Sequence, residues 1–177
     1  GLGDVYKRQL ARCAPPDAAT GAVRCPTSYP NPNMLGASFN RSAWRAMGRA
    51  IGVELRALWA QNVPENHKSE LPHVGLDCWS PNINVARDPR WGRNVEVPSE
   101  DPFHSGQYGV AYTKGLQWGN DSRYTKAIGA LKHYTIYSVE NSGGKNGGSE
   151  GFSRGSDYFE IAMKDIEETY LPQFKAP

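Results

Sequence analysis

A strand-like segment that runs into a polar loop constrains the fold of this sequence more than any other feature. Residues 76–85 predict a buried strand, and the loop from Arg87 to Arg93 holds three arginines, one carboxylate and a tryptophan. Ser99 then occupies a helix N-cap position, followed by two acidic residues and by Pro102, which the first turn of a helix tolerates. The pattern predicts a polar site at the mouth of a strand.

The segment before that strand predicts a long amphipathic helix. Asn40 is a favourable N-cap, and Phe39 with Trp44 matches the positions of a hydrophobic staple. Asn62 and Pro64 end the pattern, and residues 63–73 predict a polar loop. Apolar residues recur at spacings of three and four, which places them on one helix face: Trp44, Met47, Ile51, Leu55 and Leu58.

The rest of the chain continues the alternation of helix and strand. Residues 127–134 predict a second strand, residues 143–155 a glycine- and serine-rich loop, and Met163 begins a last helix that Pro172 kinks. This order predicts an α/β fold with a parallel sheet. The helix after Ser99 has three apolar residues on its inner face and three glycines that weaken the prediction: Phe103, Val110 and Leu116, with Gly106, Gly109 and Gly115.

Composition and charge argue against several kinds of partner. The 177 residues carry a net charge of +2, and their dispersed basic residues predict neither a nucleic-acid nor a membrane partner. No run approaches 18 consecutive apolar residues, so no membrane span is expected. We expect residues 1–23 to be a leader outside the fold, with no signal peptide visible in it.

Cysteines and glycosylation sequons leave the compartment open. Cys13 and Cys25 could form a disulfide, or they could be free thiols like Cys78. Asn40 and Asn120 each begin an N-glycosylation sequon, so a secreted or extracellular location is one expectation.

Two positions at the predicted strand ends carry candidate binding residues. One is the loop from Asp88 to Arg93, and the other is the pair Lys132 and His133. Arginine and lysine form charge-assisted hydrogen bonds with hydroxyl groups, which suits them to a sugar. Neighbouring strand residues point to opposite faces, so the pair serves one site only if the backbone bends there. The alternative is that Lys132 flanks a buried strand and His133 belongs to the core.

Other motifs carry less weight. Trp91 could stack on a sugar, although packing beneath its loop is the favoured interpretation. Residues 143–148 lack the ending of a phosphate-binding loop, and no G-x-S-x-G motif is present. His67, His73 and Cys78 fit no standard zinc spacing, so no metal is expected.

The ordered motifs resemble glycoside hydrolase family 3, the β-glucosidase and β-xylosidase group. The resemblance covers residues 24–177, and its most specific motifs are as follows: Asp88-Pro89-Arg90-Trp91-Gly92-Arg93, Ser99-Glu100-Asp101-Pro102, Lys132-His133-Tyr134 and Thr169-Tyr170-Leu171-Pro172. It implies part of the family's N-terminal (β/α)8 barrel, since a complete barrel needs about 250 residues. An unrelated α/β barrel with a coincidental loop is the weakest alternative.

The resemblance also implies roles for six residues. Arg93, Lys132 and His133 would bind hydroxyl groups of the sugar in the −1 subsite. Three further residues would hold Arg93 and its loop in place: Asp88, Arg90 and Glu100. The family requires neither a cofactor nor a metal.

The family's reaction needs residues that this sequence does not supply. A retaining glycosidase uses two carboxyl groups, and by resemblance the nucleophile and the acid/base lie beyond Pro177. We therefore expect a fragment of an exo-acting β-glycosidase that removes β-linked xylose or glucose from non-reducing ends. The alternative is a non-catalytic carbohydrate-binding protein, and no oligomeric state is predicted.

Overall fold

The computed structural model describes residues 19–20, 27–62, 75–140 and 160–177. Outside this part of the chain lie most of the leader, both cysteines of the possible disulfide, and the predicted loops at 63–73 and 143–155. The elements follow one another along the chain in this order: α2 (Pro32–Gly36), α3 (Arg41–Asn62), β1 (Asp77–Cys78), the 3-10 turn η1 (Asn94–Glu96), α4 (Pro102–Gln117), β2 (Ile128–Gly129), α5 (Met163–Asp165), the π-helical turn η2 (Ile166–Tyr170) and α6 (Pro172–Lys175).

Helix α3 confirms the predicted amphipathic helix. The Asn40 side-chain oxygen accepts a hydrogen bond from the Ala43 amide at 3.0 Å, as an N-cap should. Phe39 is 75% exposed and its ring lies against His104, so the predicted staple is wrong. The predicted apolar face is the core face of the helix: Trp44, Met47, Ile51 and Leu55 are buried, and Leu58 packs against them.

Helix α4 is present, but its cap and inner face differ from the prediction. Asp101 is the N-cap, and its carboxylate accepts hydrogen bonds from the Phe103 and His104 amides. Ser99 lies two residues earlier and accepts from the Asp101 amide at 3.0 Å. Phe103 is 66% exposed. The core face carries Tyr108, Tyr112 and Leu116, all fully buried.

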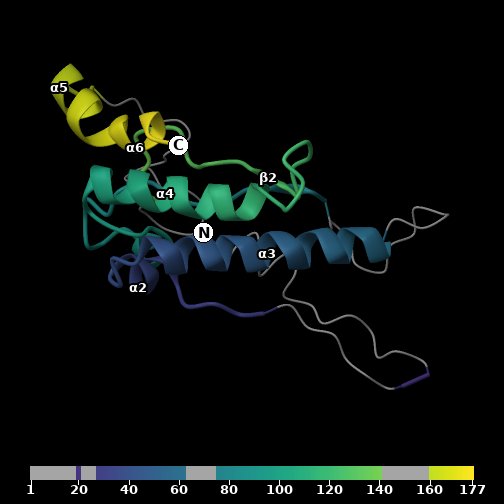
Figure 1. Ribbon diagram of the computed structural model, residues 1–177. Coiled ribbons are helices and arrows are strands. Elements are labelled where there is room, and N and C mark those ends of the chain that lie inside the picture. Colours follow the sequence, from purple (N-terminus) through teal and green to yellow (C-terminus); the bar gives the residue numbers. More distant parts are fainter. Residues whose placement is uncertain (1–18, 21–26, 63–74, 141–159) are drawn as a thin grey trace.

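Glycines let α3 and α4 pack side by side in the same direction (Figure 1). A Cβ atom at Gly52 would lie 2.3 Å from the Leu116 carbonyl oxygen, and one at Gly48 would lie 2.3 Å from the Tyr112 oxygen. A Cβ at Gly115 would meet the Arg45 oxygen at 2.1 Å. The glycine that weakened the sequence prediction for α4 is therefore what allows its backbone to touch α3.

The two predicted strands pair in parallel but are much shorter than expected. Asp77 is aligned with Ile128 and Cys78 with Gly129. Hydrogen bonds continue irregularly to Lys132, whose amide donates to the Pro81 oxygen at 3.1 Å and whose oxygen accepts from Ile83. Pro81 has no N–H group, which interrupts a regular ladder. The described residues thus form an α/β arrangement with parallel strands, and no barrel closes among them.

The last segment is three short turns rather than one helix. Pro172 begins α6 directly after the π-helical turn, which confirms the predicted break. Helix α6 packs on α4, and the Thr135 hydroxyl donates to the Tyr170 oxygen at 2.9 Å, so this segment also lies beside the chain after β2. Among the described residues, no helix has the length and apolar character needed to span a membrane.

Candidate functional site

The site lies where the chain leaves the two paired strands. A cavity of about 530 Å³ opens there, lined by residues of both post-strand loops and of the last segment. Arg93 comes from the loop after β1, His133 and Tyr137 come from the chain after β2, and Tyr170 closes one side. Two of the three predicted sugar-binding residues therefore line one cavity.

The Arg93 guanidinium is held by hydrogen bonds in a fixed orientation. Its Nε donates to Glu96 Oε2 at 2.9 Å, and its Nη2 also bonds this oxygen in an ion pair whose two side chains are less than a fifth exposed. Nη1 donates to the Tyr137 hydroxyl at 3.1 Å and lies 3.4 Å from His133 Nε2. The pKa of Glu96 is lowered. Burial by itself would raise it, but the hydrogen bonds and the positive charge of Arg93 contribute to the net lowering.

The His133 ring is fixed by Asn84. The Asn84 oxygen accepts from the His133 amide at 2.7 Å and lies 3.2 Å from Nδ1, while its amide nitrogen donates to the His133 oxygen at 2.9 Å. These contacts assign the proton to Nδ1 and leave Nε2 as an acceptor facing Arg93. Burial, then the charges of Arg93 and Lys132, lower the pKa of His133 to about 4. The imidazole is therefore neutral near pH 7.

Glu140 connects the two post-strand loops. Its carboxylate accepts from the Tyr137 hydroxyl and from Trp91 Nε1, the latter at 3.4 Å. The Trp91 and Tyr137 rings meet edge to face at 5.5 Å. Trp91 is only 4% exposed, which confirms that it packs beneath its loop.

Lys132 differs from its neighbour in position. It is half-buried and does not line the 530 Å³ cavity, while its backbone bonds the chain after β1. Its charge acts on both Cys78 and His133. The Lys132–His133 peptide bond is cis.

The three residues expected to hold Arg93 lie on the outer side of the loop. Asp88 binds Arg90, whose Nε donates at 2.9 Å, and hydrogen bonds from Arg90 lower the pKa of Asp88 to about 2. Asp88 and Glu100 line a separate cavity of about 440 Å³. The Asp88 backbone carbonyl accepts from Asn94 Nδ2 at 2.7 Å, and its carboxylate accepts from the Arg90 amide at 2.8 Å, so Asp88 braces the loop itself. Arg93 itself is contacted by Glu96, Tyr137 and His133.

Sequence reasoning missed Asn84, Tyr137 and Glu140, and it did not pair Glu96 with Arg93. The spacing of Arg93 and Glu96, three residues apart in a polar turn, was the available signal for their ion pair. No local pattern identifies Tyr137 and Glu140, because their partners lie in the other loop. Among the described residues, no cluster of three or more histidine, cysteine or acidic side chains could hold a metal ion.

Comparison with known proteins places these residues in a family. Residues 14–175 match the model described as the glycosyl hydrolase family 3 N terminal domain. The chain is 38% identical over 159 residues to Beta-D-xylosidase 3 of Arabidopsis thaliana, covering 89% of this chain and 18% of that protein. It is 38% identical over 149 residues to the exo-1,4-beta-xylosidase bxlB of Emericella nidulans, covering 84% and 17%.

Solved structures agree with the sequence matches. A family 3 exo-beta-xylosidase, XlnD, in complex with a xylobiose aziridine probe superposes with a TM-score of 0.68 at 31% identity, covering 92% of this chain and 19% of that one. Beta-glucosidase 3B of Thermotoga neapolitana shares the fold, with a TM-score of 0.59 at 21% identity, covering 91% and 18%. This chain spans less than a fifth of the length of these relatives. The chain belongs to glycoside hydrolase family 3.

Proposed function

We propose that this chain forms one wall of the sugar site in a retaining, exo-acting β-glycosidase that releases β-linked xylose or glucose from non-reducing ends. The observation that carries the proposal is the convergence of Arg93 and His133 on a single cavity from two different post-strand loops. Such a position, at the carboxyl ends of parallel strands, is where α/β barrels bind their substrates.

The hydrogen-bonding groups of this wall suit a sugar diol. Arg93 presents a charged donor, and neutral His133 presents an acceptor at Nε2, only 3.4 Å apart. Each hydroxyl of a pyranose both donates and accepts, so neighbouring hydroxyls can satisfy both groups. Lys132 is proposed to reach the same sugar, while Asp88, Arg90 and Glu100 stiffen the loop that carries Arg93.

The catalytic carboxyl groups are proposed to come from parts of the protein outside residues 1–177. A retaining mechanism needs two carboxyl groups about 5–5.5 Å apart, one to attack the sugar and one to transfer a proton. In the described part of the chain, two carboxylates bonded to residues around the cavity are Glu96, which binds Arg93, and Glu140, which binds Tyr137 and Trp91. Residues 24–177 are proposed to be part of a (β/α)8 domain that further strands complete. We also propose that the protein is secreted.

Three of the named proteins favour xylose as the sugar. Relatives at 38% identity are named as xylosidases, and XlnD binds a xylobiose probe. The second candidate is a carbohydrate-binding protein without hydrolytic activity. Glu96 and Glu140 are both engaged in structural hydrogen bonds, which favours the binding protein if the rest of the protein supplies no catalytic carboxylates.

The test is turnover of aryl β-D-xyloside and aryl β-D-glucoside by the full-length protein that contains this chain. We expect hydrolysis of the xyloside, and no hydrolysis by residues 1–177 alone. Arg93→Met removes charge-assisted hydrogen bonds and is expected to lower kcat/KM by about tenfold to a hundredfold. Arg123→Met is the matched control, because Arg123 is an exposed arginine bonded to Asp121 that does not line this cavity.

The outcomes separate the candidates. Xylose binding that depends on Arg93, without turnover by the full-length protein, would establish the binding-protein alternative. Absence of both binding and turnover would reject the sugar site altogether.

A further inference from the structure

One carboxylate joins the two loops that carry Arg93 and His133. Glu140 lies in the chain after β2 and is half-buried. Its Oε1 atom accepts a hydrogen bond from the Tyr137 hydroxyl in the same segment and another from Trp91 Nε1, at 3.4 Å, in the loop after β1. The loss of this carboxylate would therefore release an aromatic side chain in each loop.

The bond to Trp91 holds the loop that presents Arg93. Trp91 precedes Arg93 by two residues, and its ring is only 4% exposed. An indole has one polar atom, Nε1, which can only donate, so a buried indole depends on an acceptor. Glu140 supplies that acceptor from the other loop. The position of the Trp91 ring, and with it the course of the loop before Arg93, is thus tied to the chain after β2.

The bond to Tyr137 fixes the guanidinium itself. A tyrosine hydroxyl has a single proton, which here goes to Glu140 because a carboxylate can only accept. Toward Arg93 the hydroxyl can then only accept, and Arg93 Nη1 donates to it at 3.1 Å. The Tyr137 ring is held as well, by edge-to-face contacts with His133 at 4.7 Å and with Trp91 at 5.5 Å. Glu140 therefore sets the direction of the hydrogen bond that orients Arg93.

The guanidinium is held from two sides. Glu96 accepts from Nε and Nη2 of Arg93, and Tyr137 accepts from Nη1. Nη1 also lies 3.4 Å from His133 Nε2, beside the cavity that both side chains line. A displacement of about 1 Å in such a group can cost up to about a hundredfold in rate. A residue that fixes Arg93 without touching the sugar can thus have a measurable effect on the reaction.

We propose that Glu140 is a positioning residue for the sugar site, acting on Arg93 through Tyr137 and Trp91. Glu140 does not line the 530 Å³ cavity, so its effect on the sugar is indirect. The inference rests on the proposed function and deepens it, because it gives a task to a carboxylate outside the cavity.

The test is Glu140→Gln in the full-length protein that contains this chain. The amide keeps the shape of the carboxylate but is a weaker acceptor, and its nitrogen can donate to Tyr137, which would turn the hydroxyl proton toward Arg93. We expect kcat/KM for aryl β-D-xyloside to fall about tenfold, as for the loss of one charge-assisted hydrogen bond.

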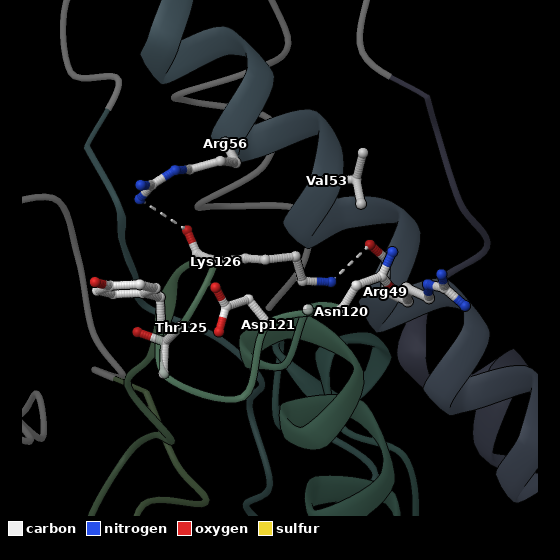
Figure 2. A pocket seen from close by; sticks show the side chains of 9 residues that line it. Arg49, Val53, Arg56, Asn120, Asp121, Thr125 and Lys126 are labelled. Atoms are coloured by element: carbon white, nitrogen blue, oxygen red, sulfur yellow. Dashed lines mark hydrogen bonds between the residues drawn. The ribbon is translucent and has the colours of Figure 1, made fainter.

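The matched control is Asp121→Asn. The Asp121 carboxylate also accepts hydrogen bonds, from Arg123 at 3.0 Å and 2.8 Å. It lines a separate cavity of about 290 Å³ beside α3, which shares no residue with the cavity at Arg93 (Figure 2). We expect kcat/KM to be unchanged in this control.

A double-mutant cycle separates positioning from a general loss of structure. Arg93→Met removes the group that Glu140 orients, so adding Glu140→Gln to that variant should lower kcat/KM by no more than about twofold. A folding defect would lower kcat/KM by the same factor in both backgrounds. Far-UV circular dichroism checks that each variant is folded. If the protein binds xylose without turnover, the same cycle is measured as xylose affinity.

Two results would overturn the positioning role. One is an equal loss from Glu140→Gln with and without Arg93, and the other is no loss in the otherwise unsubstituted protein. Failure of the proposed function gives a different pattern, in which the unsubstituted protein neither hydrolyses the xyloside nor binds xylose, or in which Arg93→Met has no effect. The positioning role would then fall together with the sugar site.

Discussion

The close approach of α3 and α4 predicts that adding one methyl group will destabilise the chain. In Gly52→Ala the new Cβ would lie 2.3 Å from the Leu116 carbonyl oxygen, whereas ordinary contacts begin at 3.4 Å. The obstacle is backbone, so it cannot move aside as a flexible side chain would. The helices must separate by about 1 Å, which forfeits a quarter to a half of the dispersion energy across the interface.

The magnitude follows from two opposing effects. Alanine improves helix propensity by about 1 kcal/mol over glycine. Overpacking a core costs about 1–3 kcal/mol, and the upper end applies because both helices must shift. We therefore expect the free energy of unfolding to fall by about 2 kcal/mol.

Urea denaturation followed by circular dichroism at 222 nm measures this loss. With a urea dependence of about 2 kcal/mol per M, the midpoint should fall by about 1 M. The matched control is Gly109→Ala on α4, where the new Cβ would meet only side chains, the nearest being Ile83 at 3.2 Å. If Gly52→Ala were as stable as Gly109→Ala, the argument from close approach would be refuted.

Three further predictions concern the site. Glu96→Gln should lower the free energy of unfolding by about 1–3 kcal/mol, because it replaces the charged acceptor of two Arg93 donors by a neutral amide; urea denaturation against Glu168→Gln, at an exposed carboxylate of η2, checks this. Tyr137→Phe removes the hydroxyl bonded to Arg93 and Glu140 while keeping the ring contacts, so xylose affinity in an NMR titration should fall with the circular dichroism spectrum unchanged. His133 has a folded pKa of about 4, below its ordinary 6.5, so it contributes stability above pH 6.5 that is lost as the pH falls toward 4. The decline in urea midpoint between pH 7 and pH 5 should be smaller in His133→Gln, and an unchanged decline would contradict the assignment.

The sequence predicted correctly the features whose stabilising contacts lie within one segment of the chain. The α3 helix carries its own cap at Asn40 and a continuous apolar face, so its sequence alone was sufficient. The parallel pairing of the strands also followed from the alternation of elements. Strand length did not, because Pro81 and the irregular hydrogen bonds after Cys78 confine the regular ladder to two residues.

Features that depend on distant partners were mispredicted or missed. The glycines in α4 weakened its prediction, because helix propensity does not account for a neighbouring helix. At Gly115, the Arg45 carbonyl oxygen leaves no room for a Cβ atom. In the site, Arg93 was found from its motif. Glu140 was not, since its function depends on Trp91, 49 residues away in the chain.

The pairing of Asn84 with His133 places two demands on one side chain. The Asn84 side chain bonds the amide and the carbonyl of position 133, so it takes the place of a neighbouring strand's main chain. Its oxygen also lies 3.2 Å from His133 Nδ1, so the same atom orients the imidazole ring. The two backbone bonds survive a change of side chain at 133, whereas a change at 84 removes the support of the backbone and the orientation of the ring together.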